Sequence, residues 1–488
     1  MRFLPGSVSA ALCLLFVSCT THAMPNEAPH LSDCRIYAAP GYPGIKARCG
    51  TFERYLDPDD PSSTVLQLNV AVVPALSLQP EPDPLVPIAG GPGGASVNFY
   101  AGYSQAFEKV RRNRDILLID ARGTGKSELM SCDSGDDVLE GQMTIEETVE
   151  MTRECLDALP HDPRFFTTSV AVRDLEALRE ALGYPALNLY GSSYGTRVAQ
   201  HYARRYPDRT RSVILDGVAP PQLALGPDIA TEAQKALDNI FARCEEDMAC
   251  NEAFPNLATR FAQLAEGLGM EPVDVRLAHP VTGELKTYTF SDMELAGALR
   301  LMSYSPTTIA LMPLMIDEAI KGNYQPLTAT FVAAAESMSD QLAIGMHNAV
   351  ICTEDTPYWG DLDTEALKHT YIGPLMAESL EAMCSVWPIG IIDDGFHEPL
   401  ATDKPVLLLS GSADPVTPPS FGDLAAVNLT NARHLTGVNQ GHGMAAQGCV
   451  PDIIGNFVAD ASFENVETEC LERLFAMPFF LDFSGPAP

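Results

Sequence analysis

The pentapeptide Gly191-Ser192-Ser193-Tyr194-Gly195 is the feature that most constrains how this chain can fold. An apolar run, residues 186–190, precedes it, and a segment of helical character, residues 196–206, follows it. Glycines two places before and after Ser193 allow a tight turn from a strand into a helix, which holds the serine hydroxyl clear of the backbone. The flanking strand and helix separate this short motif from a chance match. The pattern therefore predicts a nucleophilic serine at a helix start.

A serine needs a histidine base and a carboxylate that orients the base. Asp414 follows the apolar run 405–410, and His442 stands between two glycines. Each has an ordinary alternative, because Asp before Pro often begins a turn and a histidine between glycines is often a loop residue. Together, however, Ser193, Asp414 and His442 occur in the order of α/β-hydrolase triads. The strand before Asp414 would deliver its carboxylate to the carboxyl edge of a parallel sheet, so we expect a catalytic triad there.

A second glycine cluster, residues 90–94, follows the apolar strand expected at residues 85–89. The cluster could be a simple turn. Without side chains, however, its backbone amides can approach a substrate carbonyl and form half of an oxyanion hole. The amide of Tyr194 would be the other half.

The segment Gly123-Thr124-Gly125-Lys126-Ser127 looks like the end of a phosphate-binding loop. That motif requires a glycine where this chain has Asp120, so the nucleotide hypothesis fails. We expect Asp120 and Arg122 to brace the loop above the sheet instead.

The chain is strongly acidic, with 31 basic and 64 acidic residues and a formal net charge of −33. This balance argues against nucleic acid or an anionic membrane as a partner. The acidity would suit cationic amino termini, but it equally keeps an exported protein in solution, so it carries little weight for the substrate.

Residues 1–23 have the pattern of a signal peptide, because Arg2 precedes an apolar run, residues 10–17, that is too short to span a bilayer. We expect cleavage after Ala23 and release as a secreted or periplasmic protein. The alternative is lipid anchoring at Cys19, which follows a sequence similar to a lipobox. No other segment predicts a membrane span.

Of the 12 cysteines, two lie in this leader and ten remain. An even number after a signal peptide indicates disulfides, and pairing in sequence order is the simplest arrangement, although sequence alone leaves connectivity open. No C-x-x-C or H-E-x-x-H motif indicates a metal, and we expect no cofactor. The ten are Cys34, Cys49, Cys132, Cys155, Cys244, Cys250, Cys352, Cys384, Cys449 and Cys470.

Strand and helix patterns alternate over much of the chain, which predicts the α/β class with a parallel sheet covered by helices. We assign residues 24–220 and 401–488 to this core and residues 221–400 to a mainly helical cap inserted over the active site. The expected strands are 65–73, 85–89, 116–120, 186–190, 213–216, 405–410 and 434–436. The expected helices include 170–182, 229–248, 257–268, 291–304 and 307–321.

The motifs GGPGGAS, DARGTGKS, NLYGSSYGTR, SGSADPVTPP and QGHG resemble those of the secreted tripeptidyl aminopeptidase and proline iminopeptidase branch of the α/β-hydrolases. The resemblance implies a serine exopeptidase that acts on free peptide amino termini. It implies Ser193, Asp414 and His442 as the triad, and the amides of Gly91 and Tyr194 as the oxyanion pair. Cytosolic relatives often carry His before GGPG, and Ala89 here indicates the secreted tripeptidyl type.

An aminopeptidase needs a carboxylate for the substrate's ammonium group. Our candidates are Glu354 and Asp355, with Glu354 preferred because relatives carry an acid two places after the cysteine found here at position 352. A Cys352–Cys384 disulfide would hold this segment, although a solvated acidic loop is an equal alternative. A carboxylesterase or lipase would use the same triad, and a catalytically silent binding protein is the remaining hypothesis.

Overall fold

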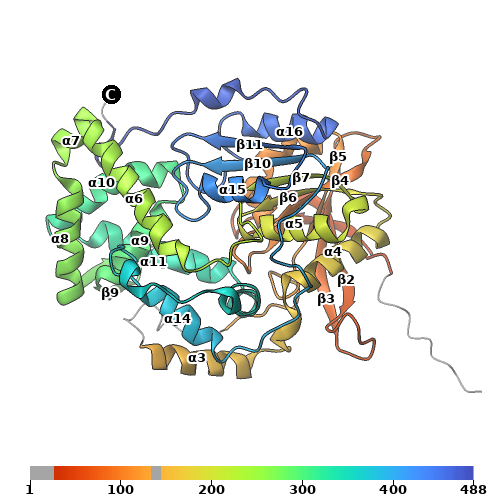
Figure 1. The fold of residues 1–488 in the computed structure, drawn as a ribbon, viewed down its shortest axis with the longest axis horizontal. Helices are drawn as coiled ribbons and strands as arrows, with labels where there is room; N and C mark the ends of the chain where they lie inside the picture. Colours follow the sequence, from red (N-terminus) through yellow and green to blue (C-terminus); the bar gives the residue numbers. More distant parts are fainter. Residues whose placement is uncertain (1–26, 133–143, 487–488) are drawn as a thin grey trace, which may run out of the picture.

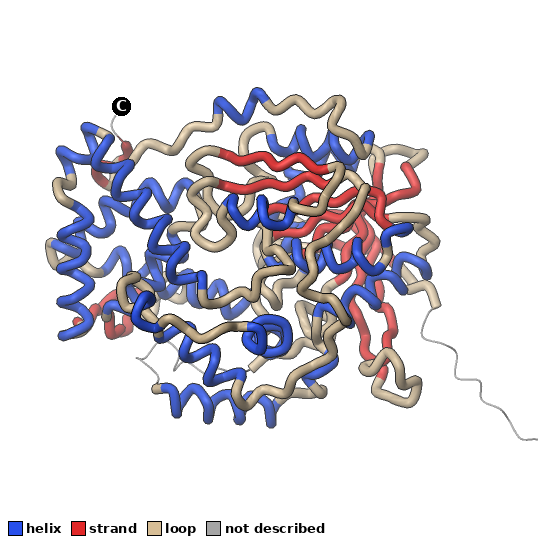
Figure 2. The backbone as a smooth tube through the Cα atoms, in the orientation of Figure 1, coloured by secondary structure: helices blue, strands red, loops and turns tan. Residues whose placement is uncertain are grey.

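A nine-stranded sheet lies at the centre of the computed structural model, which describes residues 27–132 and 144–486 (Figures 1 and 2). The strand order is β1-β2-β3-β5-β4-β6-β7-β10-β11. The six strands from β5 to β11 in this order are parallel, whereas β1, β2 and β3 pair antiparallel at one edge. The strands are β1 (Ser32–Ile36), β2 (Ile45–Tyr55), β3 (Val65–Val73), β4 (Glu81–Ile88), β5 (Arg114–Ile119), β6 (Leu187–Ser192), β7 (Thr210–Asp216), β10 (Val406–Gly411) and β11 (Ala432–Gly437).

Helices cover both faces of this sheet, as the alternating pattern predicts. In β10, Leu408 packs into the core on one face and Leu407 into the core on the other, because successive side chains of a strand point to opposite sides. Both cores are apolar, which explains why the central strands are continuous hydrophobic runs. One face carries α4 (Thr168–Ala181), α5 (Tyr194–Arg205) and α15 (Pro419–Ala426), and the other carries α1 (Ser96–Tyr103), α2 (Glu108–Arg111) and α16 (Val450–Asp460).

A second group of helices lies beside the carboxyl end of the sheet and has a hydrophobic core of its own (Figure 1). This group also contains a two-stranded sheet that the sequence analysis did not expect, β8 (Val273–Ala278) with β9 (Leu285–Phe290). Side chains of both strands, including Val275 and Phe290, are buried in this core. The helices are α6 (Asp228–Glu246), α7 (Met248–Ala253), α8 (Leu257–Met270), α9 (Asp292–Met302), α10 (Pro306–Ile320) and α11 (Gln325–Gln341).

The rest of the expected cap, from about residue 343 to 400, packs only partly against the α6–α11 group. It contains α12 (Ile344–Val350), the π-helix η5 (Ile351–Asp355), α13 (Thr364–Leu367) and α14 (Leu375–Cys384). Met346 and Trp387 belong to the hydrophobic core on the α4–α5 face of the sheet. Conversely, Phe479 near the C-terminus is buried in the core of the α6–α11 group, beside β12 (Phe480–Asp482). Apolar burial thus divides the chain differently from the expected boundaries at 221, 400 and 401.

The ten cysteines outside the leader pair in sequence order. The bonds are Cys34–Cys49, Cys132–Cys155, Cys244–Cys250, Cys352–Cys384 and Cys449–Cys470. The expected leader, with its cleavage site and Cys19, lies outside the described residues. Within the described ranges, no helix combines the length and the apolar character that crossing a membrane requires.

Candidate active site

Ser193 occupies a strained turn between β6 and α5. Its φ of 55° and ψ of −126° lie in a region that residues with a side chain rarely adopt. The two flanking glycines are required by close packing, since a methyl group on Gly191 would collide with the carbonyl of Gly195, and one on Gly195 with the carbonyl of Ile88. The Gly-x-Ser-x-Gly pattern therefore corresponds to a turn in which backbone segments approach one another closely.

Asp414 and His442 lie together at the carboxyl ends of β10 and β11. The Nδ1 atom of His442 is 2.8 Å from Oδ2 of Asp414, and the hydroxyl of Thr417 donates to the same oxygen at 2.7 Å. Backbone amides of Val416 and Thr417 donate to Oδ1 of Asp414. Burial opposes ionisation, but the His442 ring and these hydrogen bonds hold the pKa of Asp414 below its ordinary value. Likewise, burial lowers the pKa of His442, but Asp414 more than compensates and leaves it raised.

Asp216, at the end of β7, connects the serine turn to the histidine loop. Its backbone carbonyl accepts a hydrogen bond from the amide of Ser193 at 2.9 Å. Its buried carboxylate accepts from the amides of Met444 and Ala445 at 2.7 and 2.8 Å, and from the hydroxyl of Tyr190 at 2.7 Å. Burial raises the pKa of Asp216, although these donors oppose the rise. A strand is expected to end at this residue, but no sequence pattern marks it as a site residue.

Ser193 and His442 open into two neighbouring cavities. The first, of about 150 Å³, is lined by Ser193, and the second, of about 240 Å³, by His442. Tyr304 lines both cavities. Its ring meets the His442 ring edge-on with centroids 5.1 Å apart, and its carbonyl accepts a hydrogen bond from the His442 amide at 2.9 Å. A residue just after α9 thus positions the histidine loop.

The expected oxyanion pair also lies at the first cavity, since Gly91 and Tyr194 line it together with Ser193. The glycine loop packs directly against the serine, because a methyl group on Gly90 would come within 2.8 Å of the Ser193 Cβ. This loop and the start of α5 are therefore placed where backbone amides could face a reacting carbonyl, and the oxyanion role of both residues stays a prediction.

Asp228 and Arg300 bring charge to the first cavity. Both line it, and both come from the α6–α11 group. No sequence pattern marks either of them, because an acid at a helix start and a base in a last helical turn are common features of helices.

The two acids that the sequence analysis selected for amine binding have internal partners. Glu354 is fully buried and accepts hydrogen bonds from the amide and the hydroxyl of Thr168 at 2.7 and 2.8 Å. Asp355 forms a buried ion pair with Arg197 at 2.8 Å and accepts from the amide of Leu225. Neither side chain lines either cavity. The expected free carboxylate is therefore not found at this segment, because the π-helix turns both acids into the protein interior.

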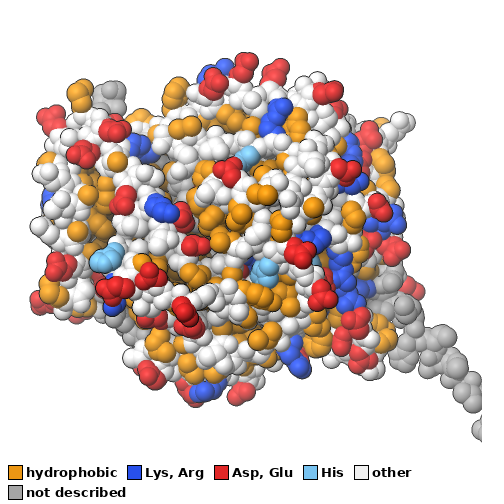
Figure 3. Space-filling view, in the orientation of Figure 1, with side chains coloured by type: hydrophobic (Ala, Val, Ile, Leu, Met, Phe, Trp, Pro, Cys, Tyr) orange, Lys and Arg blue, Asp and Glu red, His pale blue; other side chains and the backbone are white. Residues whose placement is uncertain are grey.

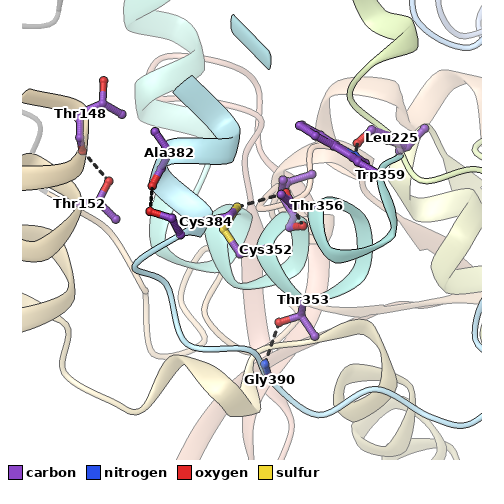
Figure 4. Close-up of a disulfide and its surroundings, with 12 residues drawn as sticks. Thr148, Thr152, Leu225, Cys352, Thr353, Thr356, Trp359, Ala382, Cys384 and Gly390 are labelled. Atoms are coloured by element: carbon purple, nitrogen blue, oxygen red, sulfur yellow. Dashed lines mark hydrogen bonds between the residues drawn. A yellow bond between two sulfur atoms is a disulfide. The ribbon is translucent and has the colours of Figure 1, made fainter. Parts of the chain in front are cut away.

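The Cys352–Cys384 disulfide joins this π-helix to the end of α14 (Figure 4). Figure 4 also shows the hydroxyl of Thr356 directed at the Cys384 sulfur and the hydroxyl of Thr353 accepting from the amide of Gly390. The disulfide therefore anchors the segment, as expected, although it does not present Glu354 to a substrate.

Glu354 is also connected to the start of α5 by hydrogen bonds through the hydroxyl of Thr168. The Tyr194 hydroxyl is 2.5 Å from the Thr168 hydroxyl, which donates to Glu354. Burial raises the pKa of Glu354 to about 7, although Arg197 opposes the rise. Because this folded pKa exceeds the ordinary value of 4.5, the folded state binds the proton more tightly than the unfolded state does. Stability from this group is present below about pH 4.5 and is lost as the pH rises through about 7.

Glu354→Gln should therefore change how stability depends on pH. We expect the free energy of unfolding of the variant, relative to wild type, to rise by up to about 3 kcal/mol between pH 4.5 and pH 8. Urea unfolding at both pH values measures this difference. Glu252→Gln, at an exposed site, is the control and should show the same relative stability at both. Equal relative stability of Glu354→Gln at the two pH values would contradict the prediction.

A second Ser–His–Asp chain joins β10, β11 and α15. The Ser410 hydroxyl is 2.9 Å from Nε2 of His434, whose Nδ1 is 2.9 Å from Asp423. Ser410, however, is fully buried within its strand and lines neither cavity. A serine that is hydrogen-bonded to a His–Asp pair is therefore not necessarily a nucleophile. Ser193 lines a cavity that a substrate could enter, whereas Ser410 does not.

The chain is similar to several known hydrolases. A family model described as "alpha/beta hydrolase fold" matches residues 83–252, and one described as "TAP-like protein" matches residues 369–470. Serine protease Hip1 of Mycobacterium tuberculosis is 27% identical over 84% of this chain and 84% of its own. Tripeptidyl aminopeptidase of Streptomyces coelicolor is 24% identical over 80% of this chain and 76% of its own. The crystal structure of proline iminopeptidase from Mycobacterium smegmatis is 13% identical, with a TM-score of 0.40, over 84% of this chain and 98% of that one.

Fold and relatives together define a serine hydrolase with the α/β-hydrolase fold. The resemblance to the tripeptidyl aminopeptidase and proline iminopeptidase branch is confirmed.

Proposed function

We propose that this protein is a serine aminopeptidase that cleaves peptides with a free amino terminus through an acyl-enzyme. His442 takes the proton of Ser193 as the serine attacks the peptide carbonyl, and Asp414 holds the imidazolium that forms. The amides of Gly91 and Tyr194 stabilise the oxyanion. His442 then gives the proton to the leaving amine, and water releases the acyl group by the same route.

The carboxylate of Asp228 carries the assignment to free amino termini. It lines the cavity of Ser193, and it has no ion pair within residues 27–132 and 144–486. Burial and the nearby Glu232 raise its pKa, while Lys235 opposes the rise. The raised pKa means that the ionised carboxylate lacks stabilising partners, which a substrate ammonium group would supply. Glu354 and Asp355, already paired inside the protein, do not fill this role.

The disulfides support export as the setting of this activity. Five disulfides are typical of oxidising compartments outside the cytoplasm. On the face shown in Figure 3, acidic side chains are spread widely, and hydrophobic side chains gather near the centre. We propose that the mature protein is secreted or periplasmic and that its substrates are peptides.

The test compares kcat/KM on one tripeptide amide with a free and with an acetylated amino terminus. Wild type should prefer the free amine by about 100-fold, and Asp228→Asn should reduce this preference to about tenfold or less, because a charged hydrogen bond is lost. Glu246→Gln, at the other end of α6, is the matched control and should keep the preference. It removes an exposed carboxylate that does not line the cavity.

Two results would count against this proposal. An unchanged preference in Asp228→Asn would show that another group binds the ammonium. Fast turnover of a short acyl ester, with no response to a free amino group in any substrate, would instead assign the protein to the carboxylesterases.

A further inference from the structure

Arg300 is the cation of the cavity that contains Ser193, and its side chain forms no hydrogen bond or ion pair in the described part of the chain. It lies in the last turn of α9, and its Nη1 atom is buried without a hydrogen-bond partner. It forms no ion pair with any carboxylate of residues 27–132 and 144–486. In a chain with 64 acidic and 31 basic residues, a half-buried arginine without a carboxylate is unexpected.

Other buried arginines of the described chain have a carboxylate or an aromatic ring as partner. Arg122 is paired with Asp174 at 2.7 Å, and Arg197 with Asp355 at 2.8 Å. Arg243, on α6, also has a buried nitrogen without a hydrogen bond, but its guanidinium lies 4.2 Å from the ring centroid of Phe479. Within the described residues Arg300 has no ion pair and no cation–π contact, although its charge opposes the rise in the pKa of the Tyr371 hydroxyl. A buried guanidinium of this kind is complementary to a carboxylate supplied from outside.

The position of Arg300 indicates which part of a substrate it would meet. It lies four residues before Tyr304, which contacts His442 through its ring and its carbonyl. Tyr304 also lines both cavities, and the charge of Arg300 acts on His442, opposing the rise in its pKa. Arg300 is thus linked through Tyr304 to the histidine, which protonates the leaving amine.

We propose that Arg300 binds a carboxylate in the leaving part of the peptide and so makes the enzyme selective for substrates that carry a negative charge just after the scissile bond. This inference rests on the proposed aminopeptidase function, with the ammonium of the substrate at Asp228. The carboxylate has two chemical sources, the free C-terminus of a short peptide or the side chain of Asp or Glu. With both charges engaged, the cavity accepts a peptide that is positive at one end and negative at the other.

The test uses one free-amino tripeptidyl group followed by four leaving parts: Ala with a free carboxylate, Ala amide, Asp amide and Asn amide. Wild type should show a kcat/KM ratio of about tenfold for Ala over Ala amide if the C-terminus is the source. The same ratio for Asp amide over Asn amide would identify the acidic side chain. Ratios near one in both pairs would overturn the proposal.

Arg300→Gln should bring the larger of the two kcat/KM ratios close to one. Arg243→Gln, which changes another arginine of the α6–α11 group, is the matched control and should keep the wild-type ratio. A wild-type ratio in Arg300→Gln, or its loss in Arg243→Gln, would overturn the assignment to Arg300. If circular dichroism shows that Arg300→Gln does not fold, Arg300→Lys replaces it. The lysine keeps the charge without the planar pair of donors, and its ratio should lie between wild type and one; an unchanged ratio would again overturn the proposal.

The Ala amide substrate separates this inference from the function on which it rests. Failure of wild type to cleave that free-amino peptide would overturn the aminopeptidase function itself. Cleavage of Ala amide without a preference for a carboxylate would overturn only the role of Arg300.

Discussion

Replacing Ser193 by alanine is expected to lower kcat/KM on a free-amino tripeptide amide by about 10⁶-fold. The hydroxyl is the proposed nucleophile, so the variant lacks the group that would form the acyl-enzyme. The oxyanion donors and the binding cavity remain in the variant, so a residual rate above the uncatalysed reaction should persist. A steady-state assay with the chromogenic tripeptide amide measures the change.

Ser410→Ala is the matched control for this experiment. Ser410 belongs to a Ser–His–Asp chain with His434 and Asp423, but it is buried away from both cavities. Its removal should leave kcat/KM within about twofold of wild type, because surface and core changes away from the site act on stability rather than on chemistry. Activity that survives in Ser193→Ala and disappears in Ser410→Ala would show that Ser410, and not Ser193, is the nucleophile.

Asp414→Asn is expected to lower kcat by about 10⁴-fold with little change in structure. The carboxylate accepts from Nδ1 of His442 at 2.8 Å and is held by the hydroxyl of Thr417 and two backbone amides. An asparagine amide at the same place would favour the wrong tautomer of the histidine and would no longer stabilise the imidazolium. Burst-phase and steady-state kinetics on the same tripeptide amide would measure the loss.

The same substitution should also change the pH profile. Because Asp414 is the main influence that raises the pKa of His442 against the effect of burial, any residual activity of the variant should require a lower pH to become half-maximal on its acid side. Asp423→Asn, beside His434 on the surface, is the control and should keep the wild-type rate and profile. A full wild-type rate in Asp414→Asn would contradict the proposed role of this carboxylate.

Local patterns in the sequence predicted much of the fold. The serine turn, the parallel strands and the helices on either side of them depend on residues close together in the chain, since strand and helix periodicity is a property of a short segment. The apolar runs before Ser193 and Asp414 were sufficient to place both residues at the carboxyl edge of a sheet. Pairing of the cysteines in sequence order is likewise found in the structure.

Some elements needed the rest of the molecule. β1 and β2 were not expected, and β2 alternates between buried and exposed residues, which is a weaker signal than a continuous apolar run. The hairpin of β8 and β9 lies within a segment of helices, and its strands become buried only against the core of α6–α11. The C-terminal segment around Phe479 joins that same core, although the chain positions suggested the sheet domain.

The sequence by itself determined that a serine stands at a strand-to-helix turn, with an acid and a histidine after later strands in the required order. Only the tertiary structure decided which charges face the reacting groups. It turned Glu354 towards Thr168 in the interior, placed Asp228 and Arg300 at the cavity of Ser193, and joined the serine and histidine segments through Asp216. The physical reason is that burial and hydrogen bonding of a charged side chain depend on segments far apart in the chain, whereas a helix, a strand or a turn depends mainly on its own residues.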